Sequence, residues 1–334
     1  MKSFLCSLLF AWANFNELGK EYNIVLETKQ IHVKDCPEAF NPSMIEFQDG
    51  YLLVFRYMPN RSLHWISYLG IVRLDQNFNP IGETQFLNTR VRNTKVPSQS
   101  EDPRLFSCKG RLFVTYNDNA EVTAPAYGER RDIYLAELYY DDDSFFLAPS
   151  VKLYYEEFYQ VQFCQKNWIP FVWNDSLLLS YTIHPHEVIQ ANLNTGNCYR
   201  LYETLGSINW GFGILRGSTP ALLIDGQYLA FFHSGAYTSS LASWGWNMWY
   251  YFMGAYTFSA EPPFELTQIS PVPISGEGFY TTSGYEKRVI FPSGFVAKDN
   301  RIYVSYGRDD REMWVATLDK EALMNSLIPV GHGR

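Results

Sequence analysis

Carboxyl, cationic and amide side chains stand at the ends of several short apolar runs in this sequence. The clearest case is Asp102 in the segment Ser100-Glu101-Asp102-Pro103-Arg104. The following proline disfavours helical backbone, so we expect the carboxyl group in an extended or turn segment. A carboxyl in that position could act as a general acid or base. The alternative is an aspartate that only caps the turn and pairs with Arg104, and the spacing leaves both interpretations open.

Other polar residues occupy comparable positions along the chain. They are Arg56, Lys166, Asn167, His233 and Asp310. If these positions converge in space, the cations and hydrogen-bond donors would form a site for an anion or for sugar hydroxyls. A single histidine at the end of a strand is more often structural. Repetition of polar residues at equivalent positions favours a shared site.

Three further motifs are less specific. His184-Pro185-His186 has no further ligands at metal-binding spacing and is interpreted as a structural loop. The acidic run Asp141-Asp142-Asp143 is interpreted as a solvated turn. The aromatic segment from Trp244 to Tyr251 could stack on sugar rings or pack in the core. Glycine-rich phosphate loops, a GxSxG elbow and an HExxH helix are missing from the sequence.

The elements that carry these residues form a five-fold repeat. Each copy has a proline-containing start, a short apolar run, a polar or glycine turn, and then alternating apolar residues, which is the pattern of a β-hairpin. The turns fall at Gly50, Gly110, Asp175, Gly226 and Asn300. Another strand-like segment follows each hairpin, at 68–74, 132–136, 187–191, 251–256 and 312–316.

Five units of this kind predict an all-β chain that folds as a single five-bladed β-propeller, with a short terminal helix over Lys320–Asn325. In a propeller, the innermost strands converge on the axis. The residues that begin the five units should therefore face one central pocket. They are Asn41, Asp102, Asn167, Ser218 and Phe291.

Composition narrows the possible functions. The 334 residues include 9 tryptophans, 24 tyrosines and 24 phenylalanines, which is typical of a folded chain with a large core. The formal net charge is −8, which argues against non-specific nucleic-acid binding because that needs a basic face. The five cysteines have no CxxC pair and are interpreted as plain thiols, although two disulfides are possible. Apolar stretches are too short to span a membrane.

The first residues raise a question of targeting. Residues 1–13 are either a signal peptide that ends at Ala11-Trp12-Ala13 or an N-terminal helix, and residues 20–334 are predicted to form the propeller domain. A cleaved leader would make the protein secreted or periplasmic. Without cleavage it would be cytoplasmic.

Several motifs in order resemble glycoside hydrolase family 130, a family of β-mannoside phosphorylases and β-mannosidases on a five-bladed propeller. The resemblance covers about 41–310. The motifs are Glu101-Asp102-Pro103-Arg104, Lys166-Asn167-Trp168-Ile169-Pro170-Phe171, Gly217-Ser218-Thr219-Pro220, Phe232-His233-Ser234-Gly235, Met253-Gly254-Ala255-Tyr256, Phe291-Pro292-Ser293-Gly294 and Tyr306-Gly307-Arg308-Asp309-Asp310.

The resemblance implies inverting cleavage of β-mannosides or a related β-glycan, with Asp102 as the general acid acting through a sugar hydroxyl. Phosphorolysis would give a sugar 1-phosphate and needs inorganic phosphate as co-substrate but no cofactor or metal. The implied phosphate and anomeric-centre ligands are Arg56, Lys166, His233 and Arg131. The implied sugar ligands are Asn41, Glu101, Arg104, Asn167 and Asp310.

Two other functions stay open. A β-mannosidase would use water and would need a carboxylate base, for which Glu101, Asp309 and Glu312 are candidates. The residues Arg308 and Asp309 stand where phosphorylases more usually have small side chains, so water could replace phosphate. A glycan-binding propeller without catalysis is the alternative from another class, and it would not need the acid and the cations together.

Overall fold

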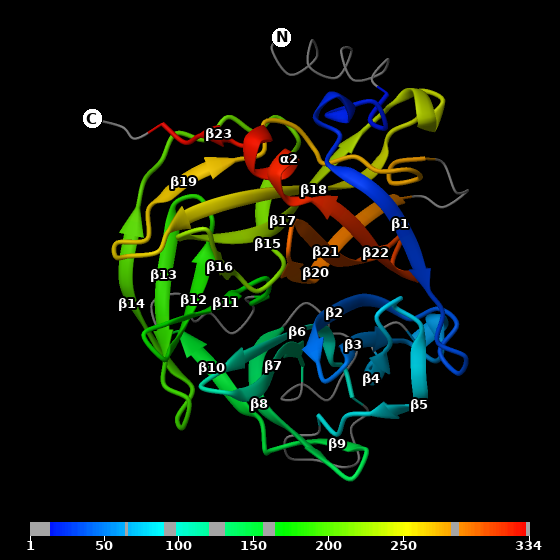
Figure 1. Ribbon diagram of the computed structural model, residues 1–334, viewed down its shortest axis with the longest axis vertical. Coiled ribbons are helices and arrows are strands. Elements are labelled where there is room, and N and C mark those ends of the chain that lie inside the picture. Colours follow the sequence, from blue (N-terminus) through cyan, green and yellow to red (C-terminus); the bar gives the residue numbers. More distant parts are fainter. Residues whose placement is uncertain are drawn as a thin grey trace.

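The computed structural model describes residues 14–63, 66–89, 98–119, 131–155, 164–281 and 287–331. These residues are mostly in β-strands, which Figure 1 shows in groups around the middle of the molecule. The possible leader, residues 1–13, lies outside the described residues. No helix among the described residues is long and apolar enough to cross a membrane.

Within each of the first three units the strands pair antiparallel and follow chain order, and a parallel pairing joins the second and third units in one nine-stranded sheet. The first contains β2 (Phe40–Phe47), β3 (Gly50–Tyr57), β4 (Tyr68–Leu74) and β5 (Pro80–Phe86). The second contains β6 (Glu101–Cys108), β7 (Arg111–Asp118) and β8 (Asp132–Asp141), and both β9 (Ser144–Leu147) and β10 (Val151–Tyr155) pair with β8. The third contains β11 (Ile169–Trp173), β12 (Ser176–Thr182), β13 (His186–Ala191) and β14 (Asn197–Thr204). The predicted hairpins and the strands behind them are therefore confirmed here.

The fourth unit departs from the predicted pattern. Its first strand is split into β15 (Ile214–Gly217) and β16 (Leu222–Ile224), which both pair with β17 (Gln227–Thr238). The break contains Pro220, which lacks the N–H needed for a continuous ladder. The unit continues with β18 (Met248–Ser259) and β19 (Leu266–Ile269).

The fifth unit takes its outer strand from the other end of the chain. The strands β20 (Lys287–Lys298), β21 (Arg301–Arg308) and β22 (Glu312–Asp319) run in order, and β1 (Val25–Ile31) pairs with β22. The predicted terminal helix is confirmed as α2 (Lys320–Ser326), where the side chain of Asp319 accepts a hydrogen bond from the Ala322 N–H. Short pieces complete the fold: η1 (Lys20–Tyr22), η2 (Arg61–Leu63), η5 (Leu241–Ser243) and β23 (Ile328–Pro329), which pairs with β19.

The core lies between successive units. On β3, Leu52 and Val54 pack into a cluster with residues of the second unit, whereas Leu53 and Phe55 pack into a cluster with residues of the fifth. Alternate side chains of one strand thus bury opposite faces, because a strand directs successive residues to opposite sides. This explains why residues 52–55 are all fully buried.

The first strands of the units surround one region of the molecule. Each unit contacts the next, and β20 of the fifth unit contacts β2 of the first. A cavity of about 500 Å³ is lined by all five units, and the C-terminal ends of their first strands contribute to it. Lining residues from the successive units include Ile45, Leu105, Phe171, Leu222 and Phe295. The predicted polar site lies at the other ends of these strands.

The structure also shows where the less specific motifs and the cysteines lie. His186 is buried, and its two ring nitrogens lie 2.7 Å from the Phe264 carbonyl and 3.0 Å from Ser180 Oγ. The acidic run forms the exposed turn between β8 and β9. Cys36, Cys108 and Cys198 are buried free thiols, as predicted, whereas Cys164 is exposed.

Candidate active site

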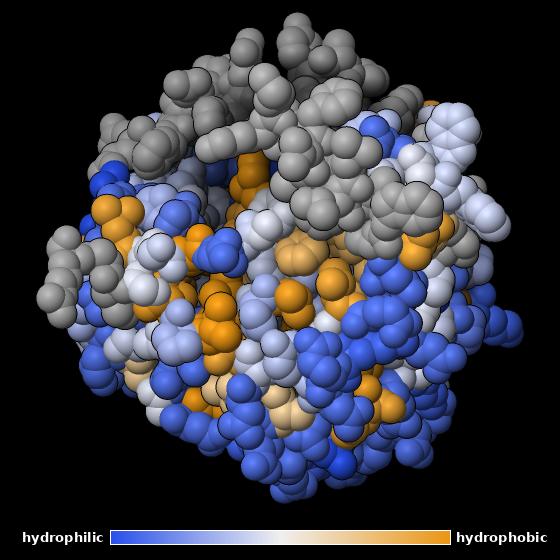
Figure 2. Space-filling view, turned by 90° about the horizontal axis from the view of Figure 1, so that it is seen from above, coloured by the Kyte–Doolittle hydropathy of each residue, from blue (hydrophilic) through white to orange (hydrophobic). Residues whose placement is uncertain are grey.

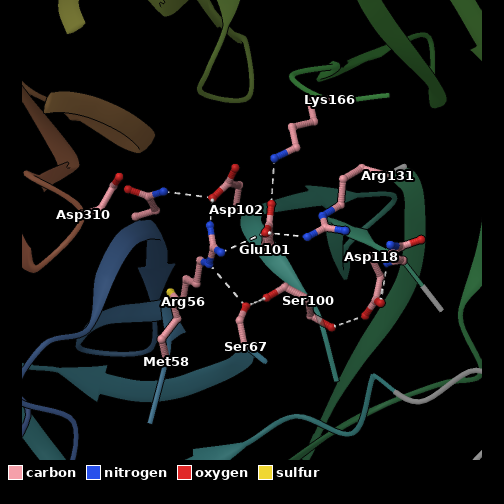
Figure 3. A network of polar contacts seen from close by, with 12 residues as sticks. Arg56, Met58, Ser67, Ser100, Glu101, Asp102, Asp118, Arg131, Lys166 and Asp310 are labelled. Carbon is pink, nitrogen blue, oxygen red and sulfur yellow. Dashed lines mark hydrogen bonds and ion pairs between the residues drawn. The ribbon is translucent and has the colours of Figure 1, made fainter. Parts of the chain in front are cut away.

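Glu101, the first residue of β6, lies at the centre of a cluster of positive charge (Figure 3). Its Oε1 atom is 2.8 Å from a guanidinium nitrogen of Arg56 and 3.2 Å from one of Arg131. Its Oε2 atom is 2.7 Å from Lys166 Nζ. The three cations come from three separate segments of the chain, and Glu101 holds them together.

Electrostatics keeps this cluster ionised. Burial opposes the charge of Glu101, but the charges of Arg56, Lys166 and Arg131 outweigh burial and hold the Glu101 pKa below its usual range. Burial likewise opposes the charge of Lys166, but Glu101 and Asp102 outweigh burial and raise the Lys166 pKa. Glu101 is therefore a carboxylate at neutral pH and has no proton to give.

Asp102 is the next residue, and its backbone is in the left-handed region with φ of 51°. Its Oδ1 atom accepts a hydrogen bond of 2.9 Å from Asn41 Nδ2 and lies 3.5 Å from Arg56 Nη1. The contacts of this carboxyl group with Asn41 and Arg56 both fall on Oδ1, and within the part of the chain that the structure describes Oδ2 has no hydrogen-bond partner. One carboxyl oxygen is thus fixed while the other is available to exchange a proton.

Three of the five predicted first residues share an unusual backbone. Asn41, Asp102 and Asn167 all have positive φ, between 50° and 66°. Asparagine and aspartate tolerate this region better than other residues with a side chain. The pairing of β2 with β3 and of β6 with β7 shifts register at these points. Such irregularities redirect side chains away from the alternation of the strand.

Arg104 ties Asp102 to the third and fourth units. It donates to the Ser218 carbonyl at 2.5 Å, to the Asp102 carbonyl at 3.1 Å and to Asn167 Oδ1 at 3.4 Å. Burial lowers its pKa to about 10, against the opposing effect of Asp102. Arg104 therefore pairs with the backbone of Asp102, and its expected role as a sugar ligand stays a prediction.

His233 lies on β17 and contacts Ser218, the predicted first residue of the fourth unit. Its Nδ1 atom is 2.7 Å from Ser218 Oγ, and its ring lies 4.5 Å from that of Phe291. Burial, followed by the charges of Arg216, Arg104 and Lys166, lowers the His233 pKa well below its usual value. The neutral imidazole is therefore favoured at this position, and the expected role of His233 as a ligand of phosphate or the anomeric centre stays a prediction.

The fifth unit contributes Asp310, which pairs with Lys287 and lies beyond Asp102 in Figure 3. Three residues before Asp310, Gly307 leaves room for Asn41, because a Cβ atom on Gly307 would lie 2.1 Å from Asn41 Oδ1. The five predicted first residues thus converge through a continuous series of contacts. That series runs from Asn41 through Asp102, Arg104 and Asn167 to Ser218, His233 and Phe291.

The three carboxylates considered as a hydrolytic base all have hydrogen-bond or ion-pair partners in the structure. Asp309 is buried, accepts a hydrogen bond of 2.9 Å from the Val289 N–H and lies 3.6 Å from Arg288. Glu312 accepts a hydrogen bond of 2.8 Å from the Trp314 indole. Glu101 is held by its three cations. Among the described residues, no group of three or more histidine, cysteine or acidic side chains could hold a metal ion.

A network behind the cations was not predicted from the sequence. Arg56 donates from Nε to Ser67 Oγ at 3.2 Å, Ser67 donates to the Ser100 carbonyl, and Ser100 Oγ donates to Asp118 at 2.6 Å. Burial raises the Asp118 pKa to about 6. Asp118 is the last residue of β7 and stands eight residues after the Gly110 turn, whereas Arg56 stands six residues after the Gly50 turn. The repeat therefore gave no signal that singled out Asp118.

The chain matches a known protein family over most of its length. The family model described as beta-1,4-mannooligosaccharide phosphorylase, of glycoside hydrolase family 130, matches residues 19–328. The chain belongs to glycoside hydrolase family 130. Members are glycoside phosphorylases or hydrolases, and the family-130 chain is an enzyme of this class that processes β-mannosides. The comparison with curated proteins finds no match.

Solved structures resemble the family-130 enzyme in fold. A glycosyl hydrolase from Bacteroides ovatus has 15% identity and a TM-score of 0.58, with 97% of each chain covered. Beta-1,2-mannobiose phosphorylase from Listeria innocua has 13% identity and a TM-score of 0.60, with 92% of this chain and 97% of that chain covered. A mannose phosphorylase from Leishmania mexicana, in complex with phosphate, has 14% identity and a TM-score of 0.59, with 95% of each chain covered.

Proposed function

We propose that this enzyme cleaves β-mannosides by inverting phosphorolysis, with Asp102 as the general acid. The observation that carries the proposal is the available Oδ2 atom of Asp102 beside a cluster in which Arg56, Arg131 and Lys166 outnumber the carboxyls of Glu101 and Asp102. The phosphorylases among the solved structures of the same fold support it. The same family supports reading the five units as the blades of one propeller domain over residues 20–334.

The proposed reaction breaks the bond between the anomeric carbon and the glycosidic oxygen. An oxygen of inorganic phosphate forms the new bond from the opposite face, which gives α-mannose 1-phosphate. Asp102 supplies the proton that the leaving oxygen takes up, through a sugar hydroxyl. Because phosphate is already an anion, it needs cationic positioning rather than a general base.

Each cluster residue then has a part in the reaction. Arg56, Arg131 and Lys166 would bind the phosphate, and neutral His233 would offer a hydrogen bond rather than a charge. Glu101 would hold the three cations in place around the phosphate. Asn41 and Asp310 would bind the glycone sugar, with Asn41 also fixing the orientation of the Asp102 carboxyl group.

The test is to incubate the purified enzyme with a panel of β-mannosides, with and without phosphate, and to follow the products by NMR. Phosphate-dependent α-mannose 1-phosphate is the expected product. Free mannose at a phosphate-independent rate would overturn phosphorolysis and favour the hydrolase. The compartment bears on this choice, because an exported enzyme would meet less phosphate than a cytosolic one.

The acid is tested separately by Asp102→Asn. We expect kcat to fall about 10²- to 10⁴-fold, the range usual for loss of a general acid. Asp225→Asn is the matched control, since this aspartate is exposed and pairs with Lys320 on the surface. Unchanged turnover in Asp102→Asn would contradict the assignment.

A further inference from the structure

The hairpin of β17 and β18 carries a series of aromatic rings that leads outward from His233. The Tyr251 ring stacks on the His233 ring at 5.6 Å with an interplanar angle of 13°. Trp249 lies 6.5 Å from Tyr251, and Tyr237 lies 5.6 Å from Trp249. The rings of Tyr251, Trp249 and Tyr237 together form the aromatic track.

The pairing of the two strands places the track on one face of the hairpin. Tyr237 is opposite Trp249 and Gly235 is opposite Tyr251, on the side chain face shared with His233. Exposure rises along the track, from 2% at His233 to 48% at Trp249 and 61% at Tyr237. The track therefore begins at the buried site and ends at the surface.

The other face of the same hairpin is buried. Tyr250 and Phe252 are 0% and 1% exposed, and the ring of Phe15 contacts both at 4.9 and 5.0 Å. The sequence allowed two interpretations of this aromatic segment, stacking on sugar rings or packing in the core. The structure divides them by face, because Tyr250 packs in the core while Trp249 does not.

The tip of the hairpin is ordered by its own hydrogen bonds. Ser240 and Ser243 bond reciprocally around η5, and Ser243 Oγ donates to the Trp246 carbonyl at 2.7 Å. Trp244 and Trp246 are nevertheless 88% and 78% exposed. Exposed rings add little to the stability of the fold, and two of them on one preformed turn offer aromatic faces to a ligand.

The surroundings favour a carbohydrate as that ligand. The tip lies at the upper right in Figure 1, and on the face that Figure 2 shows from above, hydrophobic and hydrophilic side chains lie next to one another. A sugar has apolar C–H faces and polar edges, which suit aromatic rings among polar groups. Continuity with His233 gives the direction in which a chain held at the site would extend.

We propose that the aromatic track and the exposed tryptophans of the tip form outer subsites for the sugar units of a β-mannan oligosaccharide that lie farthest from the cleaved bond. This inference rests on the proposed function and narrows its substrate to chains longer than a disaccharide. Tyr251 and Trp249 bind the nearer units, and Tyr237 and the tip bind the farther ones.

Binding to the Asp102→Asn enzyme tests the proposal without turnover. Titration with β-mannan oligosaccharides of two to six units, followed by calorimetry and tryptophan fluorescence, should show affinity that increases with chain length. In the Asp102→Asn background, Trp249→Ala should weaken the hexasaccharide about tenfold, and the loss should shrink as the chain shortens. Tyr199→Ala is the control, because this tyrosine is 52% exposed on β14 and lies outside the track.

The outcomes separate the two proposals. Affinity that is independent of chain length, or an equal loss on every length in Trp249→Ala, overturns the outer subsites even if phosphorolysis is observed. Preferential binding of the hairpin face to lipid vesicles instead of oligosaccharides also overturns them. If the wild-type enzyme cleaves no β-mannoside but another glycan binds in a manner that depends on length and on Trp249, the subsites stand and the proposed reaction fails.

Discussion

Gly307→Ala is expected to disable catalysis by displacing Asn41. A methyl group on Gly307 would lie 2.1 Å from Asn41 Oδ1 and 2.8 Å from the Asn41 backbone nitrogen, whereas ordinary contacts begin at 3.4 Å. Relief of the side-chain clash therefore needs a movement of about 1.3 Å. Asn41 holds the Asp102 carboxyl through a bond of 2.9 Å, so the acid would lose its orientation.

A misplacement of about 1 Å can cost roughly 100-fold in rate. We expect kcat of Gly307→Ala to fall by about that factor, with the free energy of unfolding lowered by about 1–3 kcal/mol through overpacking. The assay is steady-state release of mannose 1-phosphate, with thermal unfolding measured in parallel. Gly211→Ala is the matched control, because nothing lies within 4 Å of a Cβ atom at that position and its φ is not positive.

A double-mutant cycle with Asn41→Ala shows whether the clash is the cause. Asn41→Ala removes the side-chain oxygen at 2.1 Å and leaves only the backbone contacts, the nearest at 2.8 Å, so Gly307→Ala should cost less in that background. Additive effects, or a Gly307→Ala enzyme with kcat within threefold of the wild type, would refute the reasoning.

Two further predictions concern the charges. Lys166→Met should raise the KM for phosphate roughly 10- to 100-fold, because it removes a charged hydrogen bond. Lys20→Met, on the exposed surface, should leave this KM unchanged. Equal phosphate KM values for the two variants in initial-rate assays would contradict the prediction. The pKa of Asp118 is raised to about 6 in the folded protein, whereas the unfolded chain releases this proton near pH 4. The free energy of unfolding of the wild type therefore falls as the pH rises from about 4 to about 6. The stability of Asp118→Asn relative to the wild type should therefore increase by at most about 3 kcal/mol between pH 4 and 6, as urea unfolding would measure, and a pH-independent difference would refute it.

The sequence determined the elements of this protein because their signals are local. Alternating apolar residues beyond Gly50 and Gly110 predicted β3 and β7, and the segment at 68–74 coincides with β4. The repeat also predicted that the first residues of the five units lie near one another, and the bond from Asn41 to Asp102 joins two of them. Periodicity and repetition can be read without tertiary contacts, so these predictions succeeded.

Only the tertiary structure decided how the charges combine. Burial of His233 near Arg216, Arg104 and Lys166 favours its neutral form. Contacts with three cations make Glu101 an ionised spacer, and Asp118 joins the network through Ser100. A pKa depends on burial and on neighbours from distant segments, and neither is encoded in local spacing. The pairing of β1 with β22 and the division of the aromatic segment into a buried and an exposed face arise for the same reason.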